Sequence, residues 1–174
     1  LGDSFYVLTN DGAGNCKLKR AAVDRTGRED WTEVIGHRPD VLLEDFELFR
    51  GHLVVRARRA GLTHIRVVPW GEMPGYDIEF PEQAYTAYPA FTAEPDSDLM
   101  RFSYTSLTTP SSTYEFDMKT RQRRLLKRQE VLGGYDAGLY QSERLMAPGY
   151  DGTLVPISLV YRRDTARGAQ TPLL

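Results

Sequence analysis

Residues 53–68 read LVVRARRAGLTHIRVV, two runs rich in β-branched residues that are joined by the dipeptide Ala60-Gly61. Apolar and polar positions largely alternate within Leu53 to Arg59 and again within Leu62 to Val68, which is typical of β-strands. The glycine supplies the backbone freedom that a tight reversal needs. This stretch therefore predicts an antiparallel hairpin, which we take as the middle of a four-stranded unit.

The four-strand pattern recurs along the chain at a spacing close to the roughly 40 to 50 residues of one propeller blade. The opening unit has three predicted strands, at Ser4 to Thr9, Lys17 to Val23 and Trp31 to Ile35. The second has four, at Val41 to Phe49, Leu53 to Arg59, Leu62 to Val68 and Tyr76 to Phe80. The third has four, at Ala84 to Thr92, Leu99 to Ser106, Thr113 to Met118 and Arg124 to Arg128. We therefore expect an all-β chain: a partial β-propeller with two complete four-stranded blades plus part of a third.

The composition changes after Gln129. Residues 132–140 are glycine-rich and predict a linker, and a hairpin with an Asp-Gly turn follows, formed by Gln141 to Pro148 and Leu154 to Arg163. Thr171 to Leu174 would open another strand. The predicted domains are residues 1–131 for the blades, 132–140 for the linker and 141–174 for the first strands of a second domain.

The overall composition is that of an ordinary globular protein. The 174 residues carry a net charge of −2, so no charge excess indicates a nucleic acid or a membrane surface as a partner. No apolar run approaches the roughly 20 residues of a membrane helix. Cys16 is the single cysteine, which excludes an intrachain disulfide and favours a reducing, cytoplasmic location. Two and a fraction blades leave open strand edges, so we expect either self-association or a larger polypeptide around them.

Three strings together resemble one known family. They are DVLLEDFELF at residues 40–49, SLTTPSSTYEFD at residues 106–117, and SER at 142–144 followed by DGTLVPISLVY at 151–161. In this order they resemble the oligopeptidase B group of the prolyl oligopeptidase family of serine peptidases. The resemblance covers essentially the whole chain.

The resemblance implies a fold and an activity for a longer parent protein. Members of the family pair a seven-bladed propeller with an α/β-hydrolase domain, and the propeller restricts which peptides reach the active site. It implies that the hairpin begins that α/β-hydrolase domain, and that the parent hydrolyses short peptides after Arg or Lys. The family's Gly-x-Ser-x-Gly nucleophile motif, Asp and His would lie beyond Leu174. We therefore assign no catalytic, cofactor-binding or metal-binding residue to this chain, and expect peptides, the remaining blades and the hydrolase domain as its partners.

The chain contains three histidines, His37, His52 and His64, which we place in a loop, a turn and an alternating strand respectively. A structural or solvated role is favoured for each of them.

Carboxylates occur in the predicted inner strand of the second blade, at Glu44, Asp45 and Glu47. Such groups in a channel could attract a cationic peptide. The favoured interpretation is simpler, because polar side chains are common where inner strands line a water-filled channel.

Two other charged stretches have similar alternatives. The basic run from Arg121 to Arg128 could contact nucleic acid, but its alternation with Leu125 and Leu126 favours an exposed outer strand. Glu94, Asp96 and Asp98 form an acidic loop that lacks the glycine and distal glutamate of a calcium loop.

Two functional hypotheses remain open at this point. In the first, the chain is a gating and scaffolding part of a serine oligopeptidase and catalyses nothing by itself. In the second, it is a non-catalytic propeller-type interaction module that completes its ring by self-assembly.

Overall fold

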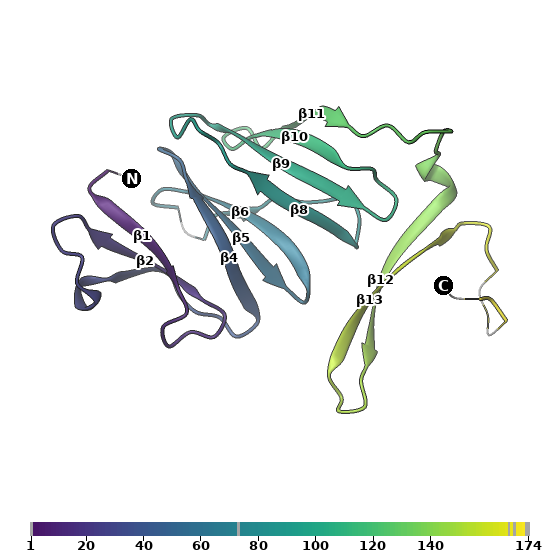
Figure 1. Ribbon diagram of the computed structural model, residues 1–174, viewed down its shortest axis with the longest axis horizontal. Helices are drawn as coiled ribbons and strands as arrows, with labels where there is room; N and C mark the ends of the chain where they lie inside the picture. Colours follow the sequence, from purple (N-terminus) through teal and green to yellow (C-terminus); the bar gives the residue numbers. More distant parts are fainter. Residues whose placement is uncertain (1, 73, 167, 169, 173–174) are drawn as a thin grey trace.

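The structure is a computed structural model that describes residues 2–72, 74–166, 168 and 170–172. These residues form three antiparallel sheets side by side, followed by a separate two-stranded hairpin (Figure 1). Two single-turn 3-10 helices, η1 (Arg28–Asp30) and η2 (Ala137–Leu139), accompany the strands. The all-β fold class predicted from the sequence is confirmed.

Each sheet follows the order of its strands along the chain, as a propeller blade does. Blade 1 contains β1 (Ser4–Thr9), β2 (Lys17–Ala22) and β3 (Thr32–Ile35). Blade 2 contains β4 (Val41–Leu48), β5 (His52–Arg59), β6 (Leu62–Pro69) and β7 (Tyr76–Asp77). Blade 3 contains β8 (Tyr85–Ala90), β9 (Leu99–Ser106), β10 (Ser112–Asp117) and β11 (Arg123–Arg128). The hairpin contains β12 (Tyr140–Pro148) and β13 (Leu154–Arg162).

The predicted strand Tyr76 to Phe80 is wrong in length, because β7 ends at Asp77. Ile78 is then held by one hydrogen bond from its backbone N–H to the carbonyl of Ile65, at 2.8 Å. Phe80 turns into the space beside blade 3, where its ring lies 4.6 Å from that of Tyr85 and 5.2 Å from that of Tyr104. The ladder ends where Ile78 and Phe80 pack into the cluster between blades 2 and 3, and burial of their apolar area stabilises this arrangement.

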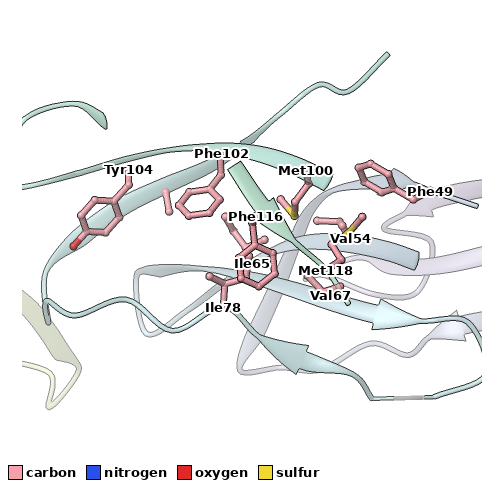
Figure 2. Close-up of a cluster of buried hydrophobic side chains, with 11 residues drawn as sticks. Phe49, Val54, Ile65, Val67, Ile78, Met100, Phe102, Tyr104, Phe116 and Met118 are labelled. Carbon is pink, nitrogen blue, oxygen red and sulfur yellow. The ribbon is translucent and has the colours of Figure 1, made fainter. Parts of the chain in front are cut away.

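The strands of blade 2 bury both of their faces. On β5, Val54 points into a cluster shared with blade 3, whereas Leu53 and Val55 point into a second cluster shared with blade 1. Successive side chains of a strand point to opposite faces, so one apolar strand supplies two cores. Figure 2 shows the cluster between blades 2 and 3, in which Met100 of β9 lies beside Val54, and Phe102 of the same strand lies farther along the cluster, near Phe116. The blades are therefore held together by side chains between sheets.

The hairpin packs differently. Its two strands pair over their whole length, from Tyr140↔Arg162 to Pro148↔Leu154. Large apolar residues on both strands are nevertheless exposed, among them Leu145, Met146 and Val160. The predicted strand opening at Thr171 to Leu174 lies partly outside the described residues, and Thr171 and Pro172 belong to no strand.

Candidate functional site

The carboxylates of β4 lie among arginines of the neighbouring strand. Glu44 accepts a hydrogen bond from Nε of Arg58 at 2.7 Å and lies 3.5 Å from Nε of Arg56. Asp45 lies 3.8 Å from the Arg56 guanidinium. These pairs neutralise much of the negative charge that the sequence places on the first strand of blade 2. They support the interpretation of Glu44 and Asp45 as polar positions of an inner strand.

Glu47 joins two blades. Its Oε1 accepts a hydrogen bond from the backbone N–H of Thr92, which follows β8, at 2.6 Å. Burial and the nearby charge of Asp45 raise the pKa of Glu47, although the bond from Thr92 opposes the rise. Beside it lies a hollow of about 290 Å³ between the first strands of blades 2 and 3, lined by Glu47, Asp45 and Phe91 among others. Phe91 is 88% exposed and is an apolar contact available to a ligand.

The three histidines occupy different surroundings. His37 is exposed. The placement of His52 in a turn is wrong, because it is the first residue of β5 and is buried, with Nδ1 3.9 Å from Oδ1 of Asp98. Its burial follows from packing of this strand end against the loop before β9. His64 lies on β6 as predicted, and burial lowers the pKa of both His52 and His64.

His64 borders a small cavity between blades 1 and 2. The cavity has a volume of about 70 Å³ and an apolar floor that includes Leu43 and Val55. At its polar end Arg66 donates two hydrogen bonds to Asp77, at 2.7 and 3.1 Å. Because Asp77 lies on β7, the last strand of blade 2, this pair links β6 to β7.

The acidic loop makes ion pairs. Asp96 accepts a hydrogen bond from Arg50 at 2.6 Å, and Asp98 lies 2.7 Å from Nζ of Lys119. Within the part of the chain that the structure describes, no group of three or more His, Cys, Asp or Glu side chains is arranged to hold a metal ion. The loop carboxylates instead join the loop to the ends of neighbouring strands.

The basic run begins in the turn before β11 at Arg121 and continues along β11, whose residues are all exposed. Arg124 donates to Glu115 at 2.7 Å, Arg123 donates to the carbonyl of Glu79 at 3.0 Å, and the Arg121 guanidinium lies 4.1 Å from the ring centre of Tyr76. These contacts within and beside blade 3 fit the interpretation of an exposed outer strand.

Sequence reasoning missed Glu82, which lies between β7 and β8. Its carboxylate accepts hydrogen bonds from the hydroxyls of four residues, Tyr104, Ser106, Thr108 and Thr109. Burial would raise the pKa of Glu82, but the bonds from these hydroxyls outweigh it and hold the pKa below its ordinary value. The hydroxyl-rich string SLTTPS was visible in the sequence, whereas its shared acceptor was not.

The contacts among these residues are hydrogen bonds and ion pairs that position side chains within and between the blades. The pattern Gly-x-Ser-x-Gly does not occur in the sequence.

The blade architecture has a counterpart among known families. The sequence model of the prolyl oligopeptidase N-terminal β-propeller domain matches residues 1–129. The chain belongs to the prolyl oligopeptidase family. The resemblance seen in the three sequence strings is thereby confirmed.

Relatives in this family match the hairpin as well as the blades. A dipeptidyl aminopeptidase BI from Pseudoxanthomonas mexicana is 45% identical over 100% of this chain and 24% of its own length. A protein named protease 2 from Moraxella lacunata is 30% identical over 99% of this chain and 24% of its own length. The chain thus spans about a quarter of the length of these curated relatives.

The solved structures of the family include oligopeptidase B from Trypanosoma brucei, in a closed form with covalently bound antipain. It superposes on this chain with a TM-score of 0.84 at 31% identity, covering 95% of this chain and 24% of the other. Among the described residues, no helix has the length and apolarity needed to cross a bilayer.

Proposed function

We propose that this chain is the last part of the propeller, together with the first hairpin of the hydrolase domain, in a serine oligopeptidase. It gates and scaffolds that enzyme and leaves the chemistry to residues outside its own sequence. The observation that carries the proposal is the match of residues 1–129 to the family's propeller domain. Relatives that also align with the hairpin support the second half of the proposal.

The physical character of the first strands supports the proposed gating role. β4 and β8 carry charged and aromatic side chains where blades 2 and 3 meet, with a hollow between them. In the complete propeller that we propose, a ring lined in this way would admit an extended peptide and exclude a folded protein by size. The apolar clusters between the blades keep the ring from opening sideways.

For the substrate, we propose hydrolysis of short peptides after Arg or Lys. The structural likeness to oligopeptidase B from Trypanosoma brucei, at 31% identity, supports this substrate class. A second candidate is removal of dipeptides from a free amino terminus. The 45% identity to a dipeptidyl aminopeptidase favours it.

The test uses the complete polypeptide that contains this chain and two fluorogenic amides of the same Arg-Arg dipeptide, one with a blocked and one with a free amino terminus. Hydrolysis of the blocked amide, abolished by a serine-directed fluorophosphonate, is the expected result. Hydrolysis of the free amide alone would select the dipeptidyl aminopeptidase. Hydrolysis of neither would overturn both.

The chain alone is the matched control. It should hydrolyse neither amide, because an acyl-transfer site needs a nucleophile, a base and oxyanion donors that this sequence does not supply. Turnover by the isolated chain would contradict the scaffolding role. A defined closed oligomer of the isolated chain would instead favour the self-assembling interaction module.

Two further features belong to this proposal. The peptide, the remaining blades and the hydrolase domain are the proposed partners, with self-association through open blade edges when they are absent. The single cysteine, Cys16, supports a cytoplasmic location.

A further inference from the structure

The hydroxyls that bind Glu82 belong to the end of β9 and the loop that follows it. Ser106 and Thr108 donate to one carboxylate oxygen, whereas Tyr104 and Thr109 donate to the other. Thr108 is buried, and its backbone N–H also donates to the Ser106 hydroxyl at 3.0 Å. A carboxylate that accepts this many bonds holds the loop in one conformation, because charge-assisted hydrogen bonds are about twice as strong as neutral ones.

The loop held by Glu82 is also where the linker attaches. The hydroxyl of Tyr135 donates to the carbonyl of Thr108 at 2.7 Å. The Tyr135 ring in turn stacks on the ring of Tyr140, the first residue of β12, with 5.7 Å between the ring centres. A continuous series of contacts therefore runs from Glu82 through Thr108 and Tyr135 to the hairpin.

The hairpin touches the blades at neighbouring turns. The backbone N–H of Arg144 lies 3.4 Å from Oε1 of Gln83, the residue after Glu82, and the Arg144 guanidinium donates to the carbonyl of Ala60. A Cβ on Gly61 would lie 3.0 Å from the Arg144 guanidinium and 3.3 Å from Cγ of Pro156. This end of blades 2 and 3 is the face on which the hairpin rests.

We propose that Glu82 is the positioning residue of this junction, which fixes the loop at residues 106–109 so that Tyr135 holds the β12–β13 hairpin against the blades. The functional consequence of this proposal rests on the proposed function. If the hairpin begins a hydrolase domain, Glu82 sets the contact between that domain and the propeller. The junction itself is defined by the contacts above.

The geometry favours a junction over a purely internal brace. The loop needs only to close β9 onto β10, and their pairing from Ser112↔Tyr104 to Asp117↔Leu99 already does that. Beyond that ladder, four hydroxyl bonds join the end of β9 and this loop to Glu82, and the loop is the one whose Thr108 carbonyl accepts the bond from Tyr135. Residues 132–134, on the amino-terminal side of Tyr135, are exposed and include two glycines. On the carboxyl-terminal side, Arg163 donates to the carbonyls of Gly138 and Leu139, and these bonds join the linker to the hairpin and not to the blades.

The experiment measures the initial rate at which a protease cuts between residues 129 and 140 of the full chain under folding conditions. The variants are Glu82→Ala and Tyr135→Phe, with Glu82→Gln as the conservative change that keeps an acceptor oxygen. Glu94→Ala removes an exposed carboxylate elsewhere in blade 3. Met100→Ala weakens the core of blade 3 without touching Glu82.

Glu82→Ala and Tyr135→Phe should each raise the cutting rate several-fold, while Glu82→Gln restores part of the protection and Glu94→Ala leaves it unchanged. Met100→Ala should lower the unfolding midpoint more than Tyr135→Phe does and yet leave the rate of linker cutting near that of the wild type.

Cutting at the wild-type rate in Glu82→Ala would overturn the proposal, and so would cutting at the wild-type rate in Tyr135→Phe. An equal rise in Met100→Ala would do the same, because it would show that general weakening of the blade releases the linker. If Glu82→Ala does not fold, Tyr135→Phe decides alone, since it removes one hydroxyl from a partly exposed side chain. Linker cutting requires no peptidase activity, so this result stands apart from the substrate test.

Discussion

The central blade and the hairpin use similar strands in opposite ways. β5 contains Leu53, Val54 and Val55, which are all but fully buried, whereas β13 contains Leu154 and Val155, which are 59% and 48% exposed. Apolar content does not distinguish these strands. The difference is that blade 2 has a sheet on each side, whereas among the described residues no further sheet covers a face of the hairpin.

The comparison teaches that alternation in a sequence specifies a strand, but the neighbouring sheets decide what its side chains contribute to stability. Burial of apolar area contributes about 25 cal/mol per Å² only when water is excluded. An exposed Leu on the hairpin contributes little in this chain, and it becomes important only if another element covers it.

The largest expected effect comes from the same truncation in the two regions. Leu53→Ala should lower the free energy of unfolding by about 2 to 5 kcal/mol, because it leaves a cavity in the core between blades 1 and 2. Leu154→Ala should change it by less than about 0.5 kcal/mol, because its side chain already meets water. Urea unfolding of both variants measures the contrast, and equal losses would remove the distinction between the regions.

A glycine in each region gives the next largest contrast. Gly75 has a φ of +75°, and a Cβ there would lie 2.3 Å from the carbonyl oxygen of Val67. Gly152, in the hairpin turn, has a φ of +81° and open space around it. Gly75→Ala should lower the free energy of unfolding by at least about 2 kcal/mol, because backbone strain and a clash with the Val67 carbonyl add together. Gly152→Ala should lower it by about 1 kcal/mol, from backbone strain alone.

Thermal unfolding followed by circular dichroism separates these two glycine variants. A loss for Gly152→Ala as large as that for Gly75→Ala would mean that the hairpin turn is packed as tightly as the central blade.

The smallest contrast concerns ion pairs. The pKa of Asp77 lies below its ordinary value, because hydrogen bonds and attraction from Arg66 outweigh the opposing effect of burial. Asp77→Asn should cost about 1 kcal/mol near neutral pH, since both side chains stay about one-third exposed and solvent screens the pair. Asp164→Asn should have no measurable effect, because the Asp164 pair with Arg162 lies in solvent.

The Asp77 effect should depend on pH in one direction. A lowered carboxyl pKa in the folded protein stabilises it fully above the ordinary value of 3.8, and this stabilisation is lost as the pH falls through the lowered pKa. The difference in the free energy of unfolding between the wild type and Asp77→Asn should therefore shrink on acidification. A difference that grew on acidification would contradict the assignment.

Local patterns in the sequence were sufficient for most of the fold. Twelve of the thirteen strands lie within about two residues of their predicted ranges, because side-chain alternation and Gly or Asp-Gly turns are local properties. The exception, β7, ends at Asp77, and the Phe80 side chain that was predicted to extend it packs against the rings of Tyr85 and Phe102 in blade 3. The prediction failed where contacts between blades compete with a ladder.

The residues of the candidate site were less predictable. His52 looks like a turn residue in sequence, and only the packing of blade 3 buries it beside Asp98. Glu82 is an isolated carboxylate in sequence, and its four hydroxyl donors lie 22 to 27 residues away. No local period connects groups at that separation.

The sequence by itself determined all the described strands but the extent of β7, their order within each blade and the family, since each depends on neighbouring residues or on short strings. Only the tertiary structure decided which faces are buried, which carboxylates are neutralised and where the linker is held. These properties arise from side chains of different sheets meeting in space, where distance and exclusion of water set the energy of each contact.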